Sequence, residues 1–346
     1  MRIGVVAPVW VPVPPKGYGG VEAVVSLLVE ELVERGHDVT LFASGDSSTK
    51  ATLRSAYETA PTDRLWEVEP DATHVGWAYR SIGAASAAGE GFDLVHDHTD
   101  FLGVAFAACL PAPVVHTVHM PLVAHRRAFL RRFSDDSHLV AISDYQRTEA
   151  PELPWRGRVH NAVDVESFPF REDKEDYLLC LGRVCARKGQ DLAIDVAHKA
   201  GLPLVLAGRV HPAESEFFEH SVLPRVDGEA VTFLGEVPDQ RKRELVAGAR
   251  ALLMPIREPE PFGLVLVEAM ASGTPVVAEP LGAVPEVVTD RETGFLASGV
   301  DAMAEAALRT GEISPERCRE EAVARFHPRA MADGYEALYR DVLGVA

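Results

Sequence analysis

The sequence predicts an α/β protein with two parallel-sheet domains, and three observations support this. The chain has 346 residues, 47% of them hydrophobic, which is enough to fill about two cores of ordinary size. Short β-branched runs alternate with amphipathic segments, as parallel sheets require, because each parallel crossover needs a covering helix. Residues 160–176 show neither apolar period and carry dense charge, so they indicate a linker between two sets of runs.

The first set predicts an N-terminal Rossmann-like domain over residues 1–168. Its strand-like runs are residues 2–7, 38–43, 93–98, 113–119 and 138–143. Between the first two runs, one helical stripe is formed by Val21, Val24, Val25, Leu28 and Leu32. Gly36 follows this stripe and is suited to the left-handed conformation that ends many helices.

The second set predicts another Rossmann-like domain over residues 169–327. Its strand-like runs are residues 176–182, 203–208, 230–235, 251–256 and 275–280. Helical segments at 239–249 and 263–273 each precede one of these runs, so strand and helix alternate again. A last amphipathic stretch, residues 327–343, follows a break at Pro328.

Composition excludes several classes of protein. Acidic residues outnumber basic ones 52 to 34, and the net charge of −18 disfavours nucleic acid and anionic lipid as partners. No signal or membrane-spanning segment is visible, and no membrane association is expected. The four cysteines lack the spacing of a zinc or redox motif, so we expect free thiols in a reducing cytoplasm: Cys109, Cys180, Cys185 and Cys318.

A glycine-rich stretch, "PPKGYGGVEAVV", joins the first strand to the first helix. Its glycines, Gly19 and Gly20 among them, let backbone amides turn toward a ligand, and the helix N-terminus favours an anion such as phosphate. The stretch is not the dinucleotide fingerprint GxGxxG, which argues against a dehydrogenase. A plain loop that needs glycine at positive φ remains the alternative.

A second loop, "LGRVCARKGQDLAI", follows a predicted strand and leads into a helix. Arg183 and Lys188 lie at the carboxyl end of that strand, where open α/β sheets bind ligands. Together the two cations could neutralise a diphosphate. The alternative is an ordinary charged loop.

Histidines gather at the ends of two predicted strands in the N-terminal half. His96 and His98 share a face with Asp100, and His116 and His119 end the next run, so a zinc cluster has to be considered. We favour a cleft that binds a phosphorylated ligand without metal. Hydrogen-bonded structural histidines are the expected outcome for His96 and His116.

The stretch "EPEPFGLVLVEAMASGTPVVAEPLGAVPE" places two glutamates around the start of an apolar helix. Glu260 precedes the helix and Glu268 lies on it, with seven residues between them. Backbone amides of Phe262, Gly263 and Leu264 open the helix and can hold an anion. The carboxylates could act as acid and base or accept hydrogen bonds from sugar or ribose hydroxyls. A helix-terminus charge and a solvated glutamate form the alternative.

These motifs together resemble the retaining GT-B glycosyltransferases of family 4. The resemblance covers nearly the whole chain and includes "YGGVE", "HDH", "TVHMP", "HNAVDVESF", "LGRVCARKG" and the Glu260–Glu268 element with its continuation. It implies two Rossmann-like domains that face each other across a cleft. It also implies that the last helix, residues 328–346, crosses back to the N-terminal domain.

The resemblance implies roles for the residues of the second domain. Glu260 would bind hydroxyls of the donor sugar, and Glu268 would hold the ribose. Arg183 and Lys188 would neutralise the donor diphosphate. The amides of residues 262–264 would contact sugar and phosphate.

Roles in the first domain follow from the same resemblance. Gly19 and Gly20 would approach the donor, and His119 would lie near the transferred sugar. His98 would face acceptor or donor in the cleft. Two departures, Ala162 in "NAVD" and Ala283 in "LGAVPE", stand where the family commonly has glycine, and Ala283 could crowd the loop beside the donor.

The sequence therefore predicts a retaining transferase that moves a hexose-type sugar from a nucleoside diphosphate, with UDP favoured. The expected acceptor is a soluble small molecule or glycoside, as in natural-product or glycoconjugate biosynthesis. No metal or other cofactor is expected, since Arg183, Lys188 and helix-terminus amides can supply positive charge. The alternatives are a nucleotide-sugar 2-epimerase of the same fold and a non-catalytic nucleotide-sugar-binding protein.

Overall fold

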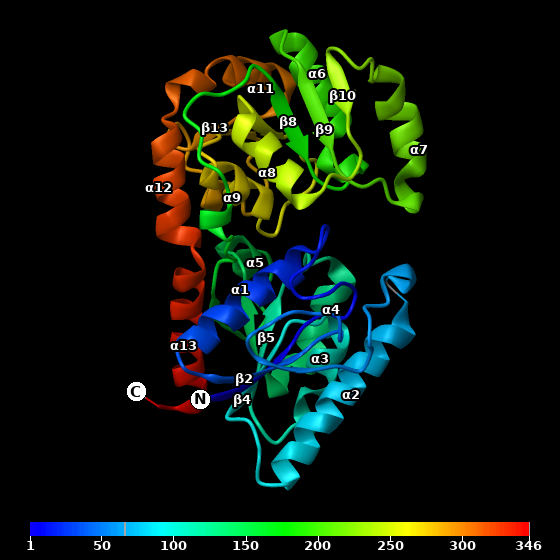
Figure 1. Cartoon of the computed structure of the whole chain (residues 1–346), viewed down its shortest axis with the longest axis vertical. Helices are drawn as coiled ribbons and strands as arrows, with labels where there is room; N and C mark the ends of the chain where they lie inside the picture. The colour runs from blue at the N-terminus through cyan, green and yellow to red at the C-terminus, as the bar shows by residue number, and fades with distance from the viewer. Residues whose placement is uncertain (66, 346) are drawn as a thin grey trace. The chain divides into compact units, whose positions relative to one another are not determined.

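The computed structural model describes residues 1–65 and 67–345, which form two compact units (Figure 1). The N-terminal unit contains Met1–Ala162 together with the chain from Pro328 onward, and the C-terminal unit is Val163–His327. In both units helices cover a parallel sheet. This is the α/β class with two Rossmann-like domains that the sequence predicts.

Within the described residues, the N-terminal unit has a seven-stranded parallel sheet in the order β3-β2-β1-β4-β5-β6-β7. Its strands are β1 (Arg2–Val6), β2 (Asp38–Phe42), β3 (Thr52–Arg54), β4 (Leu94–Asp97), β5 (Val114–Val118), β6 (Ser137–Ala141) and β7 (Trp155–Arg158). The central strands β1, β4 and β5 are almost entirely buried because helices cover both faces of the sheet. The strand order reverses between β1 and β4, which pair directly.

The N-terminal unit has α-helices from both the start and the end of the chain. They are α1 (Gly20–Glu34), α2 (Val68–Ala87), α3 (Phe101–Phe106), α4 (Ala124–Phe133), α5 (Asp144–Glu149) and α13 (Pro328–Leu343). α1 packs against α13, whereas α2, α3 and α4 pack in succession. α1 ends just before Gly36, whose φ of 83° is the left-handed conformation that the sequence predicts there.

The C-terminal unit has, within the described residues, a six-stranded parallel sheet in the order β10-β9-β8-β11-β12-β13. The strands are β8 (Leu178–Leu181), β9 (Leu204–Ala207), β10 (Val231–Phe233), β11 (Ala251–Met254), β12 (Val276–Ala278) and β13 (Gly294–Leu296). The helices are α6 (Gln190–Ala200), α7 (Ser215–Phe217), α8 (Asp239–Gly248), α9 (Leu264–Ala271), α10 (Val284–Val287), α11 (Gly299–Leu308) and α12 (Pro315–Phe326). Its order reverses between β8 and β11.

The compact units divide after Ala162, six residues before the boundary at 168 that we placed from the sequence. Val163 donates a backbone hydrogen bond to Phe326, and Arg319 donates to the carbonyl of Phe168, so residues 163–168 are attached to α12. The apolar residues Val163, Val165 and Phe168 are buried in this segment, which therefore packs as part of the C-terminal unit. The return to the N-terminal unit begins at Pro328, as the sequence predicts.

Candidate active site

The residues predicted to bind the donor follow the two strands at which the C-terminal sheet reverses. Arg183 and Lys188 follow β8, and Glu260 follows β11, its direct neighbour. Ligands of open α/β sheets bind outside the carboxyl ends of strands at such a reversal. The topology therefore brings Arg183, Lys188 and Glu260 to the carboxyl ends of neighbouring strands.

Lys188 and Glu260 are in direct contact. The Nζ of Lys188 donates to Oε2 of Glu260 at 2.5 Å, and the two side chains are only 26% and 20% exposed. The Arg183 guanidinium, in contrast, has no hydrogen-bond or ion-pair partner among the residues that the structure describes. One predicted cation is therefore paired with the predicted sugar-binding carboxylate, and the other has its donors free.

The loop that carries the two cations is held by a buried side chain. The amide of Gln190 donates to the Arg183 carbonyl at 3.0 Å, and its oxygen accepts from the Cys185 backbone N–H at 3.2 Å. Gly189, with φ of 70°, allows close approach to the next loop, because a β-carbon there would clash with the Pro255 carbonyl oxygen. The sequence showed a charged loop but not that Gln190 shapes it.

The loop that carries Glu260 is held by the segment before α10. The Ala283 backbone N–H donates to the Glu260 carbonyl at 2.8 Å, and any side chain at Gly282 would clash with the Glu260 backbone. Ala283 is fully buried with an ordinary φ of −82°. The alanine that departs from the family pattern thus fits without the left-handed conformation, which Gly282 alone adopts here.

The N-terminus of α9 presents backbone amides beside Glu260. Gly263 has φ of 90° and starts the helix, so Leu264 occupies the first helical position. The Phe262 side chain is buried and packs edge-to-face with Phe326, at a ring distance of 5.7 Å. Residues 262–264 can therefore contribute amides to an anion, while the Phe262 ring belongs to the core.

Glu268 is paired with a lysine that sequence reasoning missed. Lys242 on α8 donates to Oε1 of Glu268 at 2.8 Å and lies 3.2 Å from an oxygen of Asp239. Burial disfavours the charge on Lys242, but the two carboxylates overcome this and raise its pKa. In the sequence Lys242 lies in "DQRKREL", which is indistinguishable from a solvated helix face, so no local signal identified it.

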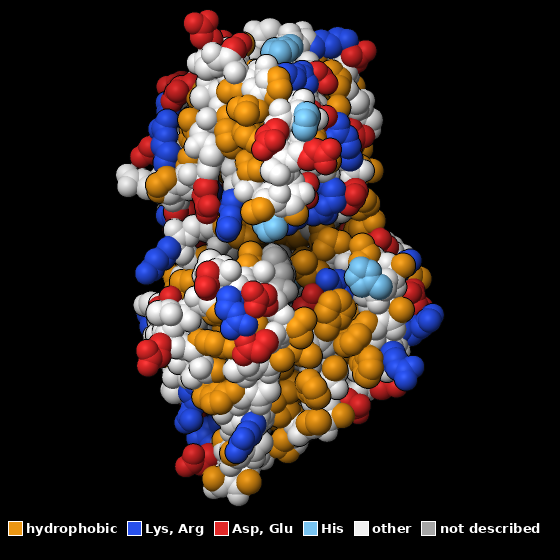
Figure 2. All heavy atoms as spheres, turned by 90° about the vertical axis from the view of Figure 1, so that its right-hand side faces the viewer, with side chains coloured by type: hydrophobic (Ala, Val, Ile, Leu, Met, Phe, Trp, Pro, Cys, Tyr) orange, Lys and Arg blue, Asp and Glu red, His pale blue; other side chains and the backbone are white. Residues whose placement is uncertain are grey.

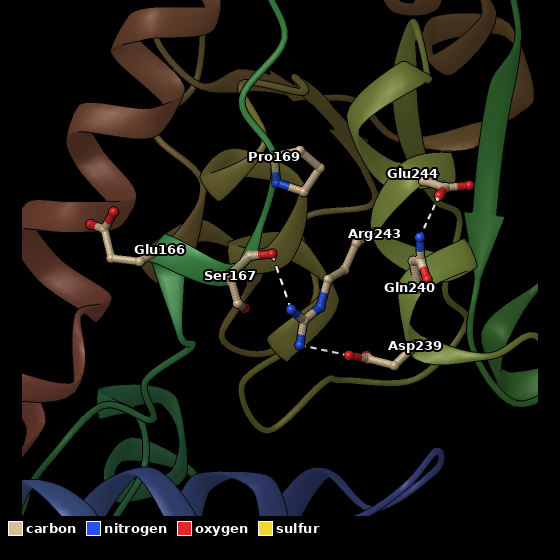
Figure 3. Close-up of a pocket in the computed structure, with 7 residues that line it drawn as sticks. All are labelled: Glu166, Ser167, Pro169, Asp239, Gln240, Arg243 and Glu244. Atoms are coloured by element: carbon tan, nitrogen blue, oxygen red, sulfur yellow. Dashed lines mark hydrogen bonds and ion pairs between the residues drawn. The ribbon is translucent and has the colours of Figure 1, made fainter.

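A separate surface pocket of about 550 Å³ lies beside α8 (Figure 3). Its lining residues are Glu166, Ser167, Pro169, Asp239, Gln240, Arg243 and Glu244. Arg243 crosses the pocket, donating to the Ser167 carbonyl at 3.1 Å and pairing with Asp239 at 2.6 Å. None of the predicted donor-binding residues lines this pocket, and we assign it no role.

In the N-terminal unit the structure joins the two predicted site histidines. His98 follows β4 and His119 follows β5, and Nδ1 of His98 lies 2.9 Å from Nε2 of His119. Burial lowers the pKa of His119 to about 3 and that of His98 well below its ordinary value. Both rings are therefore neutral near pH 7.

His96 and His116 are hydrogen-bonded structural histidines, as predicted. His96 contacts two hydroxyl groups, and His116 donates to the buried carboxylate of Asp97 at 3.0 Å. Asp97 also accepts from Thr99 and from the hydroxyl of Tyr79, at 2.8 and 3.0 Å. Among the described residues no group of three or more His, Cys, Asp or Glu side chains is arranged to hold a metal ion.

The glycine-rich loop leads directly into a buried carboxyl group. Gly19 has φ of 154°, and a β-carbon there would clash with Pro15 and Val11, so the loop requires this glycine. Gly20 begins α1, and Glu22 in its first turn is only 6% exposed. Burial raises the pKa of Glu22 to about 7. Glu22 belongs to the motif "YGGVE", but no local pattern in the sequence indicates that its carboxyl group is buried.

Comparison with known proteins shows the family to which the chain belongs. It matches the family model for glycosyl transferases group 1 over residues 164–322 and that for glycosyltransferase family 4 over residues 18–167. It is 30% identical over 364 residues to the phosphatidyl-myo-inositol mannosyltransferase of Mycolicibacterium smegmatis, covering 95% of this chain and 89% of that protein.

Solved structures agree with this match. A glycosyltransferase involved in avilamycin A biosynthesis is 27% identical, with a TM-score of 0.75 and coverage of 99% of this chain and 98% of that one. HepE of Anabaena, solved in complex with UDP-glucose, is 19% identical with a TM-score of 0.71 and covers 99% of each chain. The two Rossmann-like units and these matches define a glycosyltransferase of the GT-B type. The chain belongs to glycosyltransferase family 4. Its C-terminal unit matches the family model described as glycosyl transferases group 1.

Proposed function

We propose that this enzyme transfers a hexose-type sugar from a UDP-sugar to a soluble small-molecule or glycoside acceptor, with retention of anomeric configuration. The observation that carries the proposal is the group at the reversal of the C-terminal sheet. There the cations Arg183 and Lys188 accompany the carboxylate of Glu260 and the amides that open α9. Cations and amides suit a diphosphate, and carboxylates suit sugar and ribose hydroxyls.

The reaction breaks the bond between the anomeric carbon and the diphosphate oxygen. Negative charge develops on that oxygen, where Arg183, Lys188 and the α9 amides stabilise it more in the transition state than in the bound donor. The acceptor hydroxyl forms the new bond on the same face and passes its proton to the departing phosphate. Glu260 orients the sugar and Glu268 the ribose, so no covalent enzyme intermediate is required.

Support for UDP and for a soluble acceptor comes from relatives and from charge. HepE binds UDP-glucose, and the avilamycin enzyme serves a natural-product pathway. The net charge of −18 opposes docking on anionic membranes. Among the described residues, no helix combines the length and apolar character needed to cross a bilayer.

A lipid-linked acceptor is the second candidate, because relatives at 30% identity are phosphatidyl-myo-inositol mannosyltransferases. The structure offers one surface of suitable character, since hydrophobic side chains gather over α2, α3 and α4 of the N-terminal unit (Figure 2). Exposed Phe106, Val123 and Phe133 lie there beside the exposed Arg131 and Arg132 of α4. Cosedimentation with anionic phospholipid vesicles at physiological salt separates the candidates, and tight binding would overturn the soluble acceptor.

The donor is tested by incubating the enzyme with UDP-, GDP- and ADP-sugars and detecting products by mass, with and without excess EDTA. We expect turnover of a UDP-hexose that is unaffected by the chelator, because Arg183, Lys188 and the helix amides supply the charge that a metal would supply. Loss of activity in EDTA with rescue by Mg²⁺ or Mn²⁺ would contradict the metal-free mechanism. A new free sugar formed from donor alone would support the 2-epimerase, and binding without turnover the non-catalytic alternative.

A further inference from the structure

A buried hydrogen-bond network attaches the last helix to the strands behind the histidine pair. Nδ1 of His96 lies 2.7 Å from the hydroxyl of Tyr339, and its Nε2 lies 2.8 Å from Oγ1 of Thr117. That Thr117 oxygen lies 2.9 Å from the hydroxyl of Tyr335. All four side chains are fully buried. Both nitrogens of His96 are therefore engaged, and its ring has one satisfied orientation.

The ring of His98 packs against that of His96. The ring centroids of His96 and His98 are 3.9 Å apart. The ring of Tyr335, on α13, lies 4.6 Å from that of His96. His98 then stacks on His119, with 5.2 Å between the centroids. A rotation of His96 would consequently move His98 and, through it, His119.

Hydrogen bonding also assigns the protons of the pair. Both rings are neutral, so one proton lies between Nδ1 of His98 and Nε2 of His119. Nε2 of His98 is buried and has no hydrogen-bond partner among the described residues. A bare ring nitrogen there costs less than an unsatisfied N–H donor. We assign the His98 proton to Nδ1, which leaves His119 with its own proton on Nδ1.

We propose that Tyr335 and Tyr339 are positioning residues for sugar transfer. Through His96 and Thr117 they hold His98 so that it donates to His119, which leaves His119 its Nδ1–H as a donor for a ligand. The two tyrosines are four residues apart, so they lie on one face of α13. The role of His119 rests on the proposed function, whereas the network itself does not.

The kinetic test replaces single hydroxyl groups. Tyr339→Phe and Thr117→Val should lower kcat roughly fivefold to tenfold, the loss expected for one hydrogen bond, with KM for the donor changed less than twofold. Thr117→Ser keeps the hydroxyl and should retain activity. Tyr177→Phe is the matched control, because its hydroxyl donates to the Leu245 carbonyl at 2.7 Å in the other unit. An equal loss of kcat in Tyr177→Phe would overturn the proposal.

The second readout needs no substrate. Ring ¹⁵N–¹H correlation spectra of the whole protein should show protonated Nδ1 in both His98 and His119, with shifts that change in Tyr339→Phe and Thr117→Val but not in Tyr177→Phe. Unchanged His98 and His119 signals in the first two variants would reduce the tyrosines to packing residues. If the signals change but no donor is turned over by the unmodified enzyme, the network stands and the proposed function fails.

Discussion

A bound donor has to break the ion pair between Lys188 and Glu260. Their ion pair, at 2.5 Å, joins the side chain expected to bind the diphosphate to the one expected to bind the sugar. A diphosphate that binds Lys188 has to replace the Glu260 carboxylate, whose negative charge also repels phosphate. Because only Glu260 is paired with Lys188, replacing Glu260 and replacing Glu268 are expected to change UDP binding differently.

Glu260→Gln is expected to lower turnover while leaving the affinity for UDP unchanged or slightly higher. The variant frees Lys188 from a partly exposed ion pair, and such pairs contribute about 1 kcal/mol or less. The variant also loses the contact by which Glu260 is proposed to orient the sugar, and this loss should appear in kcat. Titration calorimetry with UDP and steady-state kinetics measure the two effects. Glu258→Gln, on the same loop and paired with Arg187, is the control.

Glu268→Gln is expected to weaken the binding of UDP and of the sugar donor alike. The substitution keeps the shape of the side chain but removes the proposed charge-assisted hydrogen bond to ribose, and such a bond is worth roughly 1.5–3 kcal/mol. It also releases Lys242 from its partner. The same calorimetric titration applies, and an equal loss of UDP affinity in Glu260→Gln would show that the two glutamates do not hold different parts of the donor.

The buried His74 should make the protein less stable in acid. Its Nε2 lies 3.0 Å from the Ala7 carbonyl, and burial lowers its pKa to about 4 from an ordinary 6.5. Between these values the unfolded chain binds the proton and the folded chain does not, so stability falls with pH from about 6.5 to about 4. The loss is at most about 3 kcal/mol.

Urea unfolding of His74→Gln at pH 7 and pH 4 checks this. Glutamine keeps a donor for the Ala7 carbonyl but does not titrate, so the wild type should lose stability relative to the variant as the pH falls. His125→Gln, at an exposed position of α4, controls for the removal of a histidine. A stability difference between wild type and His74→Gln that is the same at both pH values would contradict the prediction.

Among the elements, the C-terminal ends of α8 and α9 are joined by one half-buried lysine, Lys174. The Nζ of Lys174 donates to the carbonyls of Ala247 and Ser272, each at 3.0 Å, and to the hydroxyl of Thr274 at 2.9 Å. Carbonyls at helix C-termini lack partners within the helix, and the ammonium supplies a donor to that of Ala247. The Ser272 carbonyl accepts in addition from the Arg171 backbone N–H at 3.3 Å, and the Thr274 hydroxyl donates to the Val246 carbonyl at 2.6 Å. Burial lowers the pKa of Lys174 to about 8, below its ordinary value.

Lys174→Met should therefore destabilise the C-terminal unit by about 1–3 kcal/mol, because it leaves the Ala247 carbonyl without its donor and removes one of the hydrogen bonds of Ser272 and Thr274. Chemical denaturation gives the magnitude, and hydrogen exchange of β8 and β11 shows which unit is affected. Lys199→Met removes an exposed lysine paired with Asp301 and should cost well under 1 kcal/mol. Equal costs for the two variants would contradict the capping role.

In the whole molecule the chain leaves the C-terminal unit and returns to the first within a few residues. Phe326 on α12 is buried in the C-terminal unit, whereas Tyr335 on α13 is buried in the N-terminal unit. Phe326→Ala and Tyr335→Ala should each cost about 3–5 kcal/mol, as large-to-small changes in a core do, but in different units. Hydrogen exchange should lose protection in β8 and β11 for the former and in β4 and β5 for the latter. Loss in the same unit for both would contradict the division at Pro328.

The sequence by itself determined the class of fold and most of its strands. All ten predicted strands are present, and most of them are buried apolar runs, although β10 (Val231–Phe233) is a partly exposed edge strand. The three strands that we did not predict are β3, β7 and β13, which all lie at sheet edges. An edge strand is bonded on one side only, and β3 and β7 are partly exposed, so their residues lack that apolar signature.

The motifs and the family resemblance likewise predicted the side chains of the donor site, Arg183, Lys188, Glu260 and Glu268. Only the tertiary structure decided their partners. Lys188 contacts Glu260 across 72 residues, and Glu268 contacts Lys242 from another helix. His96 meets Tyr339 across 243 residues. Local patterns report the period and polarity of one element, whereas such contacts depend on how the crossovers and the returning helix pack, which no single segment encodes.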